Sequence, residues 1–182
     1  MLIVDDEQDV ADTQALKIDD HYETTVVYSG QAALDTAGTG FDAVLLDRRM
    51  PNVHGDEVLA RLRESGYDGV VIMLTAVDAD LNILEMAFDD YLQKPVDQST
   101  LVSTLDQHLE RTDQDDRIDE FFQITSKLAV LEREKPASQL ESNAEYTALK
   151  ERAEELEWIL TAEYDDFEEL VETHRSISRN SK

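Results

Sequence analysis

Short apolar runs that each lead into a polar or charged residue are the feature that most constrains the fold of this chain. These runs lead into Asp5 and Asp6, Asp47, Thr75 and Lys94. Runs of this length that are rich in Val and Ile indicate strands buried on both faces of a parallel sheet. Because functional groups in such a sheet gather beyond the carboxyl ends of the strands, we expect three carboxylates, a hydroxyl and an ammonium group at one edge.

Clustered carboxylates repel one another unless a divalent cation lies among them, and carboxylate oxygens together with waters suit Mg²⁺. An aspartate can attack phosphorus as a nucleophile. The metal and a lysine would neutralise the incoming charge, and a threonine hydroxyl can donate a hydrogen bond to a phosphate oxygen. The cluster therefore predicts a Mg²⁺-dependent phosphoryl-acceptor site.

At this point the chain resembles the receiver domain of two-component response regulators. The resemblance depends on four motifs taken in order, namely Val4-Asp5-Asp6-Glu7, Leu45-Leu46-Asp47-Arg48-Arg49-Met50-Pro51, Leu74-Thr75-Ala76 and Asp89-Asp90-Tyr91-Leu92-Gln93-Lys94-Pro95. Each motif is weak alone, but all four in this order at strand ends are specific.

The resemblance implies a role for each residue that matches. Asp47 corresponds to the phosphoacceptor, and Thr75 and Lys94 to the hydroxyl and the lysine that contact the phosphate. The implied Mg²⁺ ligands are Asp5, Asp6, Asp47 and the backbone carbonyl of Arg49. Thr75 and Tyr91 correspond to the switch pair, with the aromatic ring turning inward when the site is loaded.

Neighbouring polar residues have simpler interpretations. We expect Asp89 and Asp90 to be solvated loop residues. The side chains of Arg48 and Arg49 have no assigned role. The four histidines, His21, His54, His108 and His174, are expected on the surface.

Strand and helix signals alternate over residues 1–111, which indicates a parallel sheet with right-handed crossovers. We therefore predict an α/β receiver domain over 1–111, with a five-stranded flavodoxin-like sheet in the order 2-1-3-4-5. The stretch from Thr75 to Lys94 is a few residues shorter than in most receivers. We expect the fourth helix to lose about a turn, which makes the usual dimer geometry of the family doubtful for this chain.

Residues 112–182 are predicted to form a separate all-α module. A first helix carries an apolar stripe from Phe121 to Leu131 and stops at Lys135-Pro136, because proline lacks the amide donor. Ser142 and Glu145 form a candidate capping box for a second helix. That helix is expected to be long, because apolar heptad positions recur from Tyr146 to Leu170 and the pattern reaches His174, with Glu163 and His174 as exceptions.

The favoured arrangement of these helices is an antiparallel hairpin from which the long helix projects. The alternative is a continuous parallel dimeric coiled coil. Residues 115–160 also resemble the HalX module that follows receivers in haloarchaea, through the stretches 126–132 and 140–146 and then Leu149. This resemblance names a module without giving its output.

Composition adds a second constraint. The formal net charge is −26, with 42 Asp and Glu against 16 Lys and Arg, and both halves of the chain share the excess. Repulsion among so many negative charges destabilises a compact fold in dilute buffer and is screened at high salt. The composition therefore favours a salt-adapted protein over an ordinary acidic one. The chain has no cysteine, and no run is long enough to span a membrane. We expect a cytoplasmic protein with no membrane partner.

Three functions fit these features. The first is a response regulator that a sensor histidine kinase phosphorylates on Asp47 and that signals through its helical module, with no enzyme activity beyond its own phosphorylation and dephosphorylation. The second is a DNA-binding transcriptional regulator, which the charge of −10 on residues 112–182 disfavours without excluding it. The third is a phosphorylation-independent scaffold that dimerises through its C-terminal helices.

Overall fold

The computed structural model describes residues 1–36, 40–76, 79–109 and 115–180. The first part of the chain alternates strands and helices: β1 (Leu2–Val4), α1 (Gln8–Ile18), β2 (Thr25–Val27), α2 (Gly30–Thr36), β3 (Ala43–Leu46), α3 (Gly55–Glu64), β4 (Val70–Thr75), η1 (Leu81–Glu85), β5 (Asp90–Gln93) and α4 (Gln98–Leu109). Four helices follow: α5 (Asp116–Glu134), α6 (Ala137–Glu141), α7 (Ala144–Glu163) and α8 (Phe167–Asn180).

The five strands form one parallel sheet in the order β2-β1-β3-β4-β5, which confirms the predicted flavodoxin-like topology. Alternate residues along the central strands serve opposite faces, as the period of two requires. Ile3 and Leu45 pack toward α1 and α4, whereas Val4 and Leu46 pack toward α2 and α3. A 3₁₀ helix of five residues, η1, stands where a fourth helix about one turn shorter than usual was expected. The observed shortening is therefore larger than the predicted one.

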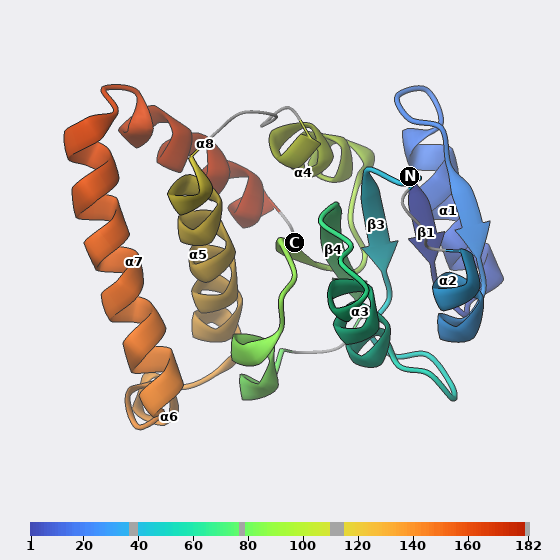
Figure 1. Ribbon diagram of the computed structural model, residues 1–182, viewed down its shortest axis with the longest axis horizontal. Helices are drawn as coiled ribbons and strands as arrows, with labels where there is room; N and C mark the ends of the chain where they lie inside the picture. Colours follow the sequence, from blue (N-terminus) through green and yellow to red (C-terminus); the bar gives the residue numbers. More distant parts are fainter. Residues whose placement is uncertain (37–39, 77–78, 110–114, 181–182) are drawn as a thin grey trace.

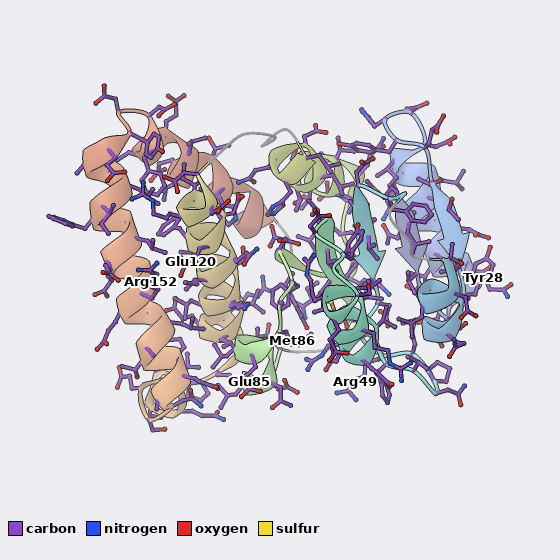
Figure 2. All side chains as sticks on the ribbon, viewed as in Figure 1. Tyr28, Arg49, Glu85, Met86, Glu120 and Arg152 are labelled. Carbon is purple, nitrogen blue, oxygen red and sulfur yellow. The ribbon has the colours of Figure 1, made fainter. Side chains whose placement is uncertain are left out.

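The C-terminal helices are called the helical module below. Figure 1 shows them beside the sheet, with α5 and α7 running antiparallel and α6 at the turn between them. The Arg152 guanidinium on α7 donates to both Glu120 oxygens on α5 at 2.8 Å, and Figure 2 labels this pair between the two helices. Leu156 and Leu160 of the heptad seam are fully buried. The predicted antiparallel hairpin is confirmed, and its seam is filled within one chain.

Two details of the second helix were predicted wrongly. The residue that caps α7 is Asn143, whose side-chain oxygen accepts from the Tyr146 amide at 2.8 Å, and not Ser142. The predicted long helix also ends at Glu163, because Tyr164 has an extended backbone. After this break α8 turns back toward α4 (Figure 1), so none of the described helices projects past the hairpin.

One hydrophobic core extends from the sheet into the helical module. Ile83, Phe88 and Tyr91 of the α/β part belong to the same buried cluster as Phe122 and Leu156 of the module. The aromatic rings of Phe121 and Phe122 meet edge-on, with centroids 5.4 Å apart, and Phe167 packs against both. Among the described residues, none of the helices combines the length and apolar character needed to cross a bilayer.

Candidate functional site

The predicted site lies where β1, β3, β4 and β5 end side by side. The Asp47 amide donates to the Val4 carbonyl at 2.8 Å, and the Lys94 amide donates to the Thr75 carbonyl at 2.8 Å. These bonds continue the parallel ladders just beyond the strands. A Cβ added at Gly55 would come within 2.2 Å of the Asp47 carbonyl oxygen, so glycine is needed where α3 begins against this edge.

A lysine links two carboxylates at the centre of the site. The Lys94 ammonium lies 2.5 Å from Asp5 Oδ2 and 2.6 Å from Asp47 Oδ1. The other oxygen of each carboxylate accepts a backbone amide, from Glu7 at 3.0 Å and from Arg49 at 2.7 Å. All three charged side chains are at most 12% exposed. Three of the five residues that predicted the site, namely Asp5, Asp47 and Lys94, are therefore in direct contact.

Burial has the largest effect on the pKa values of Asp47 and Lys94. It raises the pKa of Asp47, and the negative charge of Asp5 adds to this rise, although Lys94 opposes it. For Lys94, burial acts to lower the pKa, but hydrogen bonds from the ammonium to Asp47 and Asp5 outweigh it, so the pKa is raised. The lysine therefore stays charged beside the two carboxylates.

The chemistry of the donor set fits a hard divalent cation. Asp5 and Asp47 are nearly buried, Asp6 is half-buried beside them, and Arg49 places its backbone at the Asp47 carboxylate. Carboxylate and carbonyl oxygens are the ligands that Mg²⁺ takes, and one ammonium leaves negative charge uncompensated. Across the part of the chain that the structure describes, no group of three or more His, Cys, Asp or Glu side chains is arranged to hold a metal ion. Lys94 lies between Asp5 and Asp47 instead.

The two remaining predicted residues lie on the neighbouring strands. Thr75 is fully buried at the end of β4. Tyr91 is 4% exposed in β5, with its ring centroid 5.8 Å from that of Phe88. Burial raises the pKa of Tyr91, and the guanidinium of Arg48 acts in the opposite direction. The Tyr91 side chain thus already points inward.

Arg48 is a residue whose place at the site the sequence did not reveal. Its side chain is 5% exposed. Its Nε donates to Asp56 at 2.9 Å and its Nη2 donates to Asp80 at 3.0 Å. Arg48 therefore joins the end of β3 to α3 and to the residue before η1. A lone Arg after the aspartate gives no sequence signal for this, because its partners are 8 and 32 residues away.

The predictions for Asp89, Asp90 and two of the histidines were wrong. Asp89 is half-buried, and its carboxylate accepts from Arg63 Nη2 and from the Val71 amide, each at 2.7 Å. Asp90 is buried at the start of β5, where its carboxylate lies 3.1 Å from His108 Nε2. Burial acts to raise its pKa, but His108 and then His174 outweigh this and hold the pKa of Asp90 at about 2. His174 is 4% exposed, lies 3.3 Å from the Ser126 hydroxyl and stacks on Phe122 with ring centroids 4.5 Å apart. Among these polar groups, the effect of His174 on Asp90 crosses from the helical module to the α/β part.

The fold and this edge define a class, the flavodoxin-like α/β domains with a carboxylate–lysine cluster at the carboxyl edge of the sheet. Comparisons with known proteins name it. Residues 1–106 match the family model of the response regulator receiver domain, and residues 110–178 match the model of the HalX domain. The chain belongs to the response regulator receiver family and carries a HalX domain, and neither matched model describes a metabolic enzyme.

Relatives and solved structures agree with this assignment. A putative transcriptional regulator of Haloferax volcanii is 43% identical over 133 residues, which is 72% of this chain and 23% of that protein. The transcriptional regulatory protein CutR of Streptomyces coelicolor is 42% identical over 57% of this chain and 50% of its own length. The receiver domain of Francisella response regulator 1452 covers 62% of this chain and 97% of its own, at 30% identity and a TM-score of 0.55. This chain therefore spans half or less of the two curated relatives.

Proposed function

We propose that this protein is the response regulator of a two-component phosphorelay and that it accepts a phosphoryl group on Asp47 from a sensor histidine kinase. The observation that carries the proposal is the Lys94 ammonium within 2.6 Å of both Asp5 and Asp47. Three chain segments far apart in sequence meet there. The site is nearly closed to water, so the charged groups interact strongly.

The chemistry is a transfer from nitrogen to oxygen. A carboxylate oxygen of Asp47 attacks phosphorus, the P–N bond of the donor phosphohistidine breaks, and the leaving imidazole takes a proton. Lys94 stays charged and faces the developing negative charge on the phosphoryl oxygens. Thr75, at the end of the adjacent strand, is the hydroxyl proposed to hydrogen-bond a phosphoryl oxygen. Attack of water on phosphorus then releases phosphate and restores Asp47, and we propose no other enzyme activity.

Mg²⁺ is the cofactor proposed for this transfer. Asp5, Asp6, Asp47 and the backbone carbonyl of Arg49 would hold it, and when bound it neutralises charge on the transferred group. In its absence, Lys94 is the cation that keeps two nearly buried carboxylates together. Burial raises the Asp47 pKa and the charge of Asp5 adds to this rise, and we expect the metal to relieve the Asp5 contribution.

The HalX domain is the proposed output. We place the domain boundary at residue 111, with 1–111 as the receiver and 112–182 as the helical module, and the protein in the cytoplasm. The heptad seam of α7 is occupied by α5 within the chain, so a homodimer through the same seam would first have to open the hairpin. This favours output through contacts of an intact module.

The test is incubation with Mg²⁺ and acetyl phosphate, followed by intact-mass measurement. We expect one phosphoryl adduct on the wild type and none on Asp47→Asn. Asp42→Asn, an exposed position just before the same strand, is the matched control and should load normally. An adduct of unchanged yield on Asp47→Asn would refute the assignment of the acceptor.

Regulation of transcription by direct DNA binding is the second candidate. The curated relatives carry names of transcriptional regulators, but the chain spans half of them or less. Binding of labelled genomic DNA fragments at high salt would support it, and binding only at low salt would indicate nonspecific charge effects.

A further inference from the structure

A cavity of about 700 Å³ lies between the edge of the sheet and the helical module. All four residues of β5, from Asp90 to Gln93, line it, together with residues of α5, α7 and α8. Figure 1 shows α5 between α7 and the sheet. Ala129 of α5 lines the cavity and is exposed, so the cavity opens to solvent. It is therefore a groove over α5 with β5 and α7 as its walls, and it is called the β5 groove below.

The strand in this wall is the last one of the sheet. Among the strands that the structure describes, β5 ends the order β2-β1-β3-β4-β5 and pairs with β4 on one side. Side chains of consecutive strand residues alternate between the two faces of a sheet, so a cavity that touches four consecutive residues faces the edge of the strand. A strand edge that pairs with no other strand offers main-chain donors and acceptors to an added one. The β5 groove therefore has the means to bind an extended peptide.

The charged side chains along the β5 groove are mostly acidic. Four glutamates line it, against one arginine and one lysine, Arg133 and Lys150. Arg133 already pairs with the adjacent Glu134, with Nε and Oε1 3.4 Å apart. On the α7 wall, Glu154 and Glu157 face the groove beside Lys150. The negative charge that remains favours a peptide with basic side chains.

An exposed tryptophan adjoins the same wall. A second hollow on α7 is lined by Trp158, Thr161 and Ala162 and shares Glu154 and Glu157 with the β5 groove. Trp158 is the only tryptophan of the chain and is 76% exposed. The face of a tryptophan ring attracts ammonium and guanidinium groups more strongly than that of any other side chain. An indole ring next to carboxylates is thus suited to an arginine or lysine side chain.

We propose that the β5 groove binds an extended, basic segment of a partner protein, which adds to β5 as a sixth strand and places an arginine or lysine against Trp158. β5 spans about 13 Å at 3.3 Å per residue, so main-chain pairing covers about four residues of the segment. In this mode of recognition the main chain supplies affinity and alternate side chains supply specificity. The inference goes beyond the proposed function, because it requires no phosphoryl group on Asp47.

The experiment measures binding of fluorescein-labelled peptides to the full chain by fluorescence anisotropy, in a salt concentration at which the chain is folded. The probe is a peptide of alternating valine and arginine, and its matched control carries N-methyl groups on the valine amides. The probe should bind saturably. N-methylation should weaken binding about tenfold or more, because it removes main-chain hydrogen bonds and leaves the side chains unchanged. A peptide with glutamate in place of arginine should not bind.

Variants of the protein test the α7 wall. Trp158→Ala and Glu154→Lys should each weaken binding of the probe about threefold or more. Leu16→Ala and Glu64→Lys are the matched controls, because Leu16 on α1 is 75% exposed and Glu64 on α3 is exposed. Both controls should bind the probe as the wild type does.

Several outcomes would overturn the proposal. Equal binding of the N-methylated peptide would exclude strand addition, and wild-type affinity in Trp158→Ala or in Glu154→Lys would indicate general attraction to an acidic chain. Absence of saturable binding by the wild type would overturn it too, as would a stable dimer in sedimentation velocity that Ala129→Arg dissociates, because a second copy would then fill the groove. The N-methyl comparison uses the wild-type chain alone, so it decides the matter even where a variant fails to fold.

Discussion

The buried guanidinium of Arg48 gives the sharpest stability prediction. In Arg48→Met the side chain keeps most of its volume and loses its hydrogen bonds to Asp56 and Asp80. Breaking a fully buried ion pair costs about 3–5 kcal/mol. Asp56 and Asp80 are 43% and 44% exposed, so water replaces much of what they lose. We therefore expect destabilisation of about 2 kcal/mol.

The assay is urea unfolding at fixed salt, with Arg61→Met as the matched control. Arg61 is 50% exposed and pairs with Glu57 one helical turn away, so its loss should cost only about 0.3–0.5 kcal/mol. Both variants remove one positive charge from a chain of net charge −26, which cancels the effect on overall repulsion. Salt at 1 M should abolish the Arg61 effect and leave most of the Arg48 effect. Equal losses in the two variants would refute the structural role of Arg48.

Three further predictions concern other parts of the molecule. The pKa of Asp90 lies at about 2 in the fold, below its ordinary value of 3.8, so its contribution of roughly 2 kcal/mol is complete above about pH 4 and is lost as the pH falls toward 2. Asp90→Asn should flatten the low-pH part of an acid-unfolding curve, and an unchanged low-pH part would contradict the buried contact between Asp90 and His108. Phe122→Ala removes a ring that is 1% exposed and should cost about 3–5 kcal/mol in urea unfolding, whereas Leu16→Ala, 75% exposed, should stay within about 0.5 kcal/mol; similar losses would argue against the shared core. Chelation of Mg²⁺ with EDTA should abolish the acetyl phosphate adduct, and an undiminished adduct in EDTA would count against a metal-dependent transfer.

The sheet and the central cluster were predictable because their signals are local. Each strand is a buried apolar run, and the residues after these runs must meet at one edge whatever the details of packing. The contact of Lys94 with Asp5 and Asp47 follows from this topology alone.

The break between α7 and α8 could not be read from the heptad pattern. Phe167 keeps its heptad position, since it is fully buried against Phe121 and Phe122, but it reaches that core after a turn. Asp165 and Asp166 favour turns and helix starts over helix interiors, which was the local signal for the break. A period of seven does not distinguish a continuous helix from two helices whose spacing happens to match.

Buried charges were missed for a different reason. Asp90, His108 and Lys127 lie in sequence contexts that resemble ordinary surface, and their partners come from elements brought together only by tertiary packing. Their burial depends on tertiary packing, which no single stretch of sequence encodes.

The continuous core makes the receiver and the helical module hard to separate. A receiver cut at residue 111 would lose the module residues that pack in the same core as Phe88 and Tyr91. The excised fragment should therefore expose apolar surface, aggregate more readily and be less soluble than the parent chain. A different output domain fused to the same receiver would fold well only if it supplied apolar or aromatic side chains to cover Phe88 and Tyr91. The receiver and the helical module should therefore have evolved together, with little recombination of either with other domains.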